Sequence, residues 1–118
     1  MLAPDYEVPR DFNASEHFIA RHVREGRGDK VAYIHDGGTL TYAELASRVE
    51  RFAAALWANR IEPENRVVLL MHDTPDFVVA FFGCLRAGVV PIPLNTLLTE
   101  KDYEYLLADS RAKAVFVS

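Results

Sequence analysis

The sequence predicts an α/β fold: part of a three-layer sandwich, with helices flanking a mostly parallel sheet and a small β-hairpin near the N-terminus. The stretch from Arg66 to Asn95 has the pattern of a strand, a crossover helix and a second strand without interruption. Two β-prone runs meet at Gly37 and Gly38 earlier in the chain, and a further helix and apolar run follow Asn95. Strands that alternate with helices of this length are typical of parallel sheets.

The composition is that of one ordinary globular domain. The chain has 118 residues, of which 50% are apolar and 25% are charged. Its formal net charge of -4 argues against a nucleic-acid partner, because the chain lacks a basic stripe that would neutralise phosphates. The basic residues Arg21, Arg24 and Arg27 are interrupted by Glu25, so we interpret them as a solvated helix end.

The single cysteine and the lack of long apolar segments indicate a cytoplasmic protein. Cys84 has no second cysteine to pair with and lies in an apolar helical pattern, which favours a buried structural thiol in a reducing compartment. No segment approaches the length of a membrane span, and the first residues lack the basic and apolar regions of a signal peptide. We therefore expect no membrane partner.

The first elements follow from local signals. Residues 1–11 contain two prolines and no periodicity, which predicts an extended lead-in on the surface. Asn13 and Glu16 form an N-terminal box that opens a short helix ending at Gly26 and Gly28. The helix carries a modest apolar stripe of Phe18, Ile19, His22 and Val23.

A hairpin and the longest helix come next. Residues 30–35 and 39–42 are β-prone runs around Asp36, Gly37 and Gly38, which predicts a small antiparallel hairpin. Thr41 and Glu44 then form a capping box that opens the helix. We expect its inner face to cover the sheet; this face comprises Leu45, Val49, Phe52 and Leu56, flanked by Ala46, Ala53 and Trp57.

The central unit begins with the apolar run 67–71, which predicts a parallel strand covered on both faces. Thr74 is expected to cap the next helix through its hydroxyl, with Pro75 at the first helical position and Gly88 after the last. Apolar side chains surround most of this helix, so we expect it to be buried.

Two prolines characterise the strand that follows. Pro91 and Pro93 lie two residues apart, so their missing N–H groups point toward the same side. The strand is therefore predicted at an edge of the sheet or at a local break in it.

The last part of the chain predicts one more helix and strand. Thr99 and Asp102 form a third capping box, and the helix that follows carries Tyr103, Leu106 and Leu107 on its expected inner side. The run Ala114–Val117 is predicted to be another buried strand. Strands of a parallel sheet normally lead into another connection, so we expect the chain to be a piece of a larger domain.

The residues alone predict no catalytic, cofactor-binding or metal-binding residue in this chain. The histidines lack the i, i+3 or i, i+4 spacing of a metal pair on one helix face: His17, His22, His35 and His72. His72 is the most notable because it follows the central strand, yet the neighbouring Asp73 and Thr74 are explained as helix-start residues. Glycine-rich phosphate loops and a nucleophile elbow are missing from the sequence.

The order of landmarks resembles the N-terminal region of the adenylate-forming acyl- and aryl-CoA ligases, and within them a benzoate-CoA ligase. The resemblance runs from about Phe12 to Ser118. It is carried by a Thr-Tyr-x-Glu-Leu helix start, an Arg-Val strand, an Ala-Gly turn followed by proline, a Leu-Asn pair, and the segments MHDTPDF and PLNTLL. Many relatives have Gly-Asp before the Arg-Val strand, where this chain has Glu64 and Asn65.

The resemblance implies a two-step reaction in the intact enzyme. The family joins a carboxylate to MgATP, giving an acyl-adenylate and pyrophosphate, and the CoA thiol then displaces AMP. The phosphate loop with its lysine, the acyl and adenine pockets, the hinge aspartate and the catalytic lysine of the family are not matched by any position here. We therefore expect residues 1–118 to be an N-terminal fragment of the large domain, inactive alone, with ATP, Mg²⁺ and CoA used only by the intact enzyme on a small aromatic carboxylate.

Two other readings stay open from the sequence. One keeps the chemistry and changes the substrate, as in a fatty acyl-CoA ligase or an amino-acid-activating domain. The other is a natural short chain that acts as a binding or regulatory module. For the ligase fragment, the unfinished sheet should expose apolar surface where the rest of the domain would pack, so we expect homo-oligomers or self-association.

Overall fold

The computed structural model describes residues 7–118. The expected lead-in over residues 1–11 lies outside the described residues for its first six positions, and residues 7–11 are exposed and form neither helix nor strand. The elements in chain order are η1 (Glu16–Ala20), α1 (Arg21–Arg24), β1 (Val31–His35), β2 (Gly38–Thr41), α2 (Tyr42–Ala58), β3 (Arg66–Leu70), α3 (Pro75–Ala87), β4 (Val90–Pro93), α4 (Glu100–Ser110) and β5 (Ala114–Val117).

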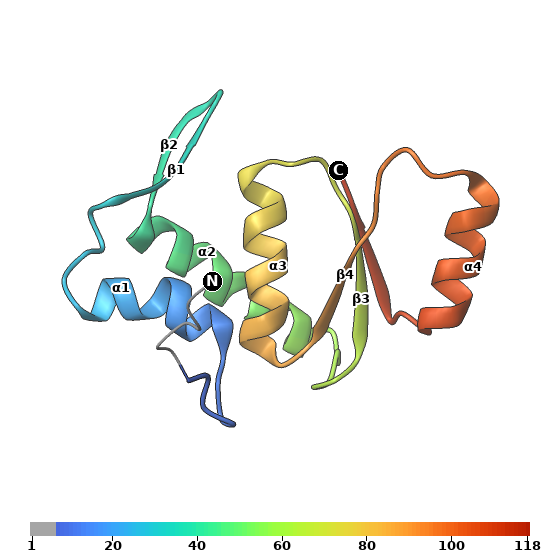
Figure 1. Cartoon of the computed structure of the whole chain (residues 1–118), viewed down its shortest axis with the longest axis horizontal. Coiled ribbons are helices and arrows are strands. Elements are labelled where there is room, and N and C mark those ends of the chain that lie inside the picture. Colours follow the sequence, from blue (N-terminus) through green and yellow to red (C-terminus); the bar gives the residue numbers. More distant parts are fainter. Residues whose placement is uncertain (1–6) are drawn as a thin grey trace, which may run out of the picture.

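The main sheet is parallel and has β3 at its centre, as predicted. Its strand order is β4-β3-β5, and the antiparallel pair β1-β2 forms a separate hairpin. Helices α2 and α3 lie on one side of the sheet and α4 lies on the other (Figure 1). This arrangement confirms the predicted α/β class and its three layers.

Helix α2 packs mainly against α3, and its inner face contacts two different neighbours. Leu45 and Val49 belong to a cluster with side chains of η1, β2 and α3. Ala53 and Leu56 instead pack with Val67 and other buried residues of β3 and α3. The prediction that α2 covers the sheet is therefore correct for the second half of the helix only. Trp57, expected to flank that face, is 48% exposed.

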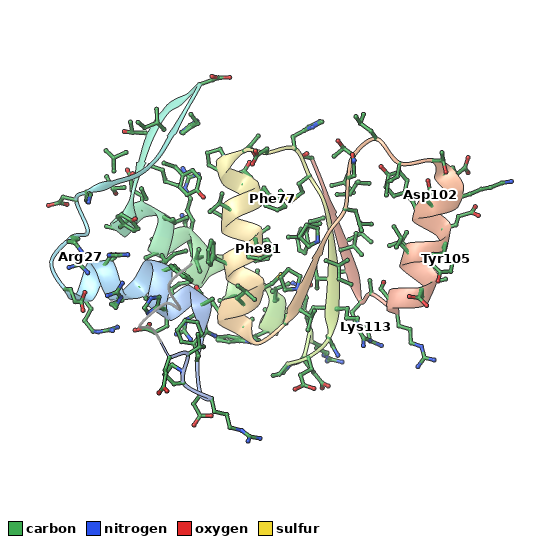
Figure 2. All side chains as sticks on the ribbon, in the orientation of Figure 1. Arg27, Phe77, Phe81, Asp102, Tyr105 and Lys113 are labelled. Atoms are coloured by element: carbon green, nitrogen blue, oxygen red, sulfur yellow. The ribbon has the colours of Figure 1, made fainter. Side chains whose placement is uncertain are left out.

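Helix α3 is buried around its circumference, as predicted, and no residue from Phe77 to Ala87 is exposed. Figure 2 shows Phe77 and Phe81 directed from α3 toward the sheet, where they pack on the core cluster. The helix starts with Pro75 at its first position and ends at Gly88, whose φ of 76° is left-handed. The expected hydroxyl cap is wrong: Thr74 occupies the N-cap position without a side-chain cap hydrogen bond.

Strand β4 is an edge strand of the main sheet, and its backbone explains both prolines. The N–H groups of Val90 and Leu94 donate to β3 and its lead-in, at 2.8 Å to the Asn65 carbonyl and 3.0 Å to the Leu69 carbonyl. Pro91 and Pro93 alternate with these donors, so their nitrogens face away from β3. The predicted edge position is confirmed within residues 7–118.

The prediction that Ala114–Val117 is a buried strand is wrong. Strand β5 forms at these residues but occupies the second edge of the sheet, and Val115 and Val117 are 43% and 66% exposed. These two side chains face the α4 side of the sheet, and α4 itself has no buried residue. Leu107, expected on the inner side of α4, is exposed as well.

The N-terminal helical segment differs from its prediction in two ways. Its first turns are a π-helix, η1, which continues into the short α1. Asn13 caps it by accepting from the backbone of Ser15 and Glu16 at 2.9 and 3.3 Å, but the Glu16 carboxylate forms an ion pair with Arg24. Of the expected apolar stripe only Ile19 is buried.

The hairpin is confirmed, with Asp36 and Gly37 between its two strands. It projects away from the body of the molecule, and Leu40 is its one buried residue (Figure 1). No helix within residues 7–118 is long and apolar enough to cross a membrane.

Candidate functional site

The carboxyl ends of β3 and β4 form the part of this fold where open parallel sheets place their ligands. A pocket of about 340 Å³ lies there, between the end of β3, the start of α3 and the loop after β4. Its lining consists of Met71, Asp73, Phe77, Pro93, Leu94 and Asn95. This pocket is the candidate site because it lies at the carboxyl ends of the parallel strands, and we call it the carboxyl-edge pocket.

Tyr103 of α4 fixes the loop that forms one wall of this pocket. Its hydroxyl donates to the Asn95 carbonyl at 2.7 Å and accepts from the Leu98 N–H at 3.1 Å. The Asn95 side chain accepts from the Leu97 N–H at 2.9 Å, which closes a local turn. The loop is therefore held by side chains as well as by the strand that precedes it.

His72 lies beside the carboxyl-edge pocket, as its position after the central strand predicts. It is exposed, and its backbone N–H donates to the Ser118 hydroxyl at 2.8 Å, which joins the ends of β3 and β5. Asp73 lines the pocket, and Asp76 lies in the first turn of α3 beside it in sequence. Neither 71–76 nor 94–99 contains a lysine or an arginine.

The charges at this edge do not fit a polyphosphate. Two acids without a basic side chain would repel phosphate oxygens, and Pro75 removes one of the N–H groups at the start of α3. Among residues 7–118, no group of three or more His, Cys, Asp or Glu side chains could hold a metal ion. The carboxyl-edge pocket thus offers an apolar wall and a carboxylate, without phosphate-binding equipment.

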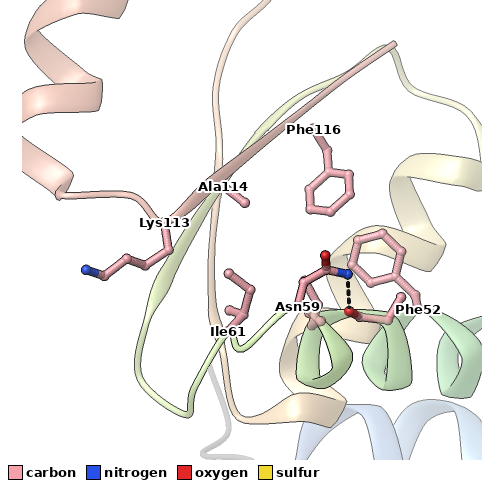
Figure 3. Close-up of a pocket in the computed structure, with 8 residues that line it drawn as sticks. Phe52, Asn59, Ile61, Lys113, Ala114 and Phe116 are labelled. Carbon is pink, nitrogen blue, oxygen red and sulfur yellow. Dashed lines mark hydrogen bonds between the residues drawn. The ribbon is translucent and has the colours of Figure 1, made fainter.

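A larger pocket, of about 490 Å³, opens between the second half of α2 and β5. Figure 3 shows Phe52, Asn59 and Ile61 facing the residues of β5, Ala114 and Phe116. The rings of Phe52 and Phe116 have centroids 4.8 Å apart. We call this apolar space the α2/β5 pocket. It lies beside an edge strand and at the amino end of the sheet, whereas open parallel sheets bind their ligands at the carboxyl ends of the strands.

Two of the other histidines, His22 and His35, are held by contacts with neighbouring residues. His22 packs against Tyr42 with ring centroids 4.5 Å apart, and Arg27 Nε donates to its Nδ1 at 3.0 Å. Burial lowers the pKa of His22 below 6.5, and the positive charge of Arg27 lowers it further. His35 Nδ1 accepts from the Gly37 N–H at 3.1 Å, inside the hairpin turn.

Cys84 is fully buried in α3, as predicted. Burial raises the pKa of its thiol to about 12, so the thiolate needed for a nucleophile does not form near neutral pH. The thiol belongs to the core cluster, together with Leu69 of β3 and Leu56 of α2. Its role is to fill space between the helices and the sheet.

Comparison with known proteins gives the family. The model of the AMP-binding enzyme family matches residues 19–118. This chain belongs to that family. It is 48% identical over 109 residues to the 4-hydroxybenzoate–CoA/benzoate–CoA ligase of Rhodopseudomonas palustris, covering 92% of this chain and 20% of that protein. It is 46% identical over 116 residues to the benzoate–CoA ligase of Thauera aromatica, covering 98% of this chain and 22% of that protein.

A solved structure agrees with these relatives. The benzoate CoA ligase from Burkholderia xenovorans superposes with a TM-score of 0.84 at 47% identity, over 90% of this chain and 21% of that one. This chain therefore spans about a fifth of the length of the relatives it matches. The resemblance to adenylate-forming ligases, and most of all to benzoate-CoA ligases, is confirmed.

One departure from the family pattern has a structural consequence. Glu64, which departs from the Gly-Asp expected from the family resemblance, adopts a left-handed backbone with φ of 66°. Its N–H donates to the Gly88 carbonyl at 2.8 Å, which ties the turn before β3 to the end of α3. The turn is thus formed with a residue that is less suited to its left-handed conformation than glycine.

Proposed function

We propose that this chain is the N-terminal part, residues 1–118, of the large domain of a benzoate-type CoA ligase. The observation that supports this most strongly is the identity of 48% and 46% to two benzoate–CoA ligases across nearly the whole chain. The intact enzyme would activate a small aromatic carboxylate with ATP to an acyl-adenylate and transfer the acyl group to CoA. Mg²⁺ would accompany ATP, and the cytoplasm would be the compartment.

Within that enzyme, the chain would act as a scaffold and contribute no catalytic, cofactor-binding or metal-binding residue. The acidic carboxyl-edge pocket supports a scaffold role, because the negative charges of Asp73 and Asp76 disfavour binding of the triphosphate of ATP there. The buried, high-pKa thiol of Cys84 also fits a packing role. The chain by itself would therefore not consume ATP.

Pyrophosphate release by the intact protein tests the proposal. Benzoate and 4-hydroxybenzoate should support release in the presence of ATP and Mg²⁺, while octanoate and amino acids should support far less. The chain 1–118, assayed alongside, should release none with any acid. Preference for octanoate or for an amino acid would instead establish a fatty acyl-CoA ligase or an amino-acid-activating domain.

A further inference from the structure

The segment between α1 and the hairpin is bonded to the start of α2. This segment, residues 25–30, is here called the α1/β1 junction. The Tyr42 N–H donates to the Lys30 carbonyl at 3.0 Å, and the Ala43 N–H donates to the Gly28 carbonyl at 2.9 Å. These two hydrogen bonds join the chain just before β1 to the chain just after β2. They therefore close the base of the hairpin.

Arg27, which lies where the chain leaves α1 (Figure 2), holds the junction to α1 through its backbone and its side chain. Its backbone N–H donates to the His22 carbonyl at 2.7 Å, and its Nε–H donates to His22 Nδ1 at 3.0 Å. The Arg27 guanidinium also forms an ion pair with Glu25. A ring nitrogen accepts a hydrogen bond only when it carries no proton, so His22 is neutral here, with its proton on Nε2. The other face of the contact is the uncharged ring of Tyr42, which packs on His22.

The surroundings of His22 oppose its protonation. Burial is the largest cause that lowers the pKa of His22 from 6.5. The positive charge of Arg27 lowers the pKa further, and Arg21 and Lys30 act in the same direction. The carboxylate of Glu25 acts in the opposite direction. The contact with Arg27 is thus built for a neutral imidazole and is sensitive to acid.

We propose that the contact between His22 and Arg27 is an acid-sensitive anchor of the hairpin. When Nδ1 takes up a proton from solvent, two N–H groups and two positive charges face each other, so the Arg27 side chain must leave His22. Arg27 keeps its ion pair with Glu25, but Glu25 belongs to the junction and does not replace the lost link. The junction then opens more often, its two hydrogen bonds to α2 break more often, and the base of the hairpin loosens.

Proton linkage gives the size of the effect. Because the pKa of His22 is lowered in the closed junction, the anchor is complete above pH 6.5 and weakens as pH falls through the pKa of the closed state. Opening of the junction frees His22, whose pKa then returns to 6.5. The loss of amide protection, in powers of ten, should therefore equal the difference between 6.5 and the measured pKa of His22.

Nuclear magnetic resonance of the full chain measures both quantities. Ring nitrogen spectra should show His22 with its proton on Nε2 at about pH 8 and should give a pKa below 6.5. Hydrogen exchange of the Tyr42 and Ala43 N–H groups, corrected for intrinsic rates, should accelerate between about pH 8 and about pH 5 by the factor that this pKa gives. Exchange of these two groups should not respond to low urea, which distinguishes opening of the junction from global unfolding.

Three variants separate the contact from the rest of the fold. Arg27→Met keeps a long side chain without the charge or the donor, so the pKa of His22 should rise and the pH dependence of exchange should shrink by the same factor. The matched control is Arg24→Met, which removes a charge that pairs with Glu16 and should leave both quantities unchanged. His22→Asn places an amide oxygen that does not titrate near the position of Nδ1, so exchange corrected for intrinsic rates should no longer depend on pH.

Four results would overturn the proposal. They are a His22 pKa of 6.5 or above, a proton on Nδ1 at about pH 8, constant protection of Tyr42 and Ala43 while His22 titrates, and equal effects of Arg24→Met and Arg27→Met. The measurements use no ATP, carboxylate or CoA, so such results would leave the proposed ligase function untouched. An inactive protein in the pyrophosphate assay would likewise leave the anchor untouched.

Discussion

Adding one methyl group at Gly83 should destabilise the chain, although alanine favours helices. At Gly83, α3 approaches α2 closely: a Cβ built there would lie 2.6 Å from Cδ1 and 2.9 Å from Cβ of Phe52. Rotation of the Phe52 ring relieves the first contact only, because its Cβ is fixed to the α2 backbone. The two helices must separate to accept Gly83→Ala.

Two opposing effects set the change in stability that Gly83→Ala should cause. Replacing glycine with alanine inside a helix contributes about 1 kcal/mol of stability, while overpacking a buried contact costs about 1 to 3 kcal/mol. Helices α2 and α3 bury most of the core between them, so we expect the upper half of that range and a net loss of about 1 to 2 kcal/mol. For a domain of this size that loss lowers Tm by about 5 to 10 °C.

Urea unfolding followed by circular dichroism measures the loss directly. Ala54→Gly, at an exposed position of α2, should cost about 1 kcal/mol and calibrates the helix-propensity effect in this chain. In a Phe52→Ala background, where the ring contact is gone, the cost of Gly83→Ala should fall by roughly half. If Gly83→Ala were more stable than the unmodified chain, the close approach of α2 and α3 would be refuted.

Three further perturbations test particular contacts. Glu64→Gly should raise the free energy of unfolding by up to about 1 kcal/mol, because glycine adopts the left-handed φ of 66° without strain; lower stability in urea would refute that reading. Because the pKa of His22 is lowered from 6.5 in the folded chain, the unfolded chain binds more protons, so stability should decrease as pH falls below about 6.5. His22→Gln should flatten this decrease in a series of urea titrations, and an unchanged slope would contradict it. Thr41→Ala should cost about 1 kcal/mol by removing the N-cap of α2. Hydrogen bonds from Thr41 lower the pKa of Glu44, so the cap's stabilisation should fade as pH falls below 4.5; a cost that stayed constant to pH 3 would argue against the capping box.

Features set by residues close in sequence could be predicted. The capping boxes at Thr41 and Thr99 form as expected, with the Asp102 carboxylate accepting from the Thr99 N–H at 3.0 Å. Gly88 and the alternating prolines of β4 were also predictable, since each acts through its own φ angle or missing N–H.

Features that depend on distant partners could not be predicted. The run of β5 is as apolar as that of β3, and only the strand order shows that Val115 lies at an edge. Likewise, the spacing on α4 gives Leu107 an inner position without revealing that the facing layer leaves it exposed. The missing cap bond at Thr74 and the π-helical start at Glu16 have no local signal that we can identify.

For the candidate site, topology was the useful signal. The position of His72 after the central strand placed it correctly at the carboxyl edge. Its hydrogen bond to Ser118 joins residues 46 positions apart, and the link from Tyr103 to Asn95 requires knowing how α4 folds back on the loop. A tyrosine in an amphipathic helix gives no indication of such a role.

Product identification in the intact protein tests the central claim most directly. With benzoate, ATP, Mg²⁺ and CoA, mass spectrometry should find benzoyl-CoA and AMP in equal amounts, and benzoyl-adenylate should accumulate when CoA is left out. Formation of ADP in place of AMP, or no thioester from any aromatic carboxylate while another acid is activated, would contradict the assignment to a benzoate-type ligase.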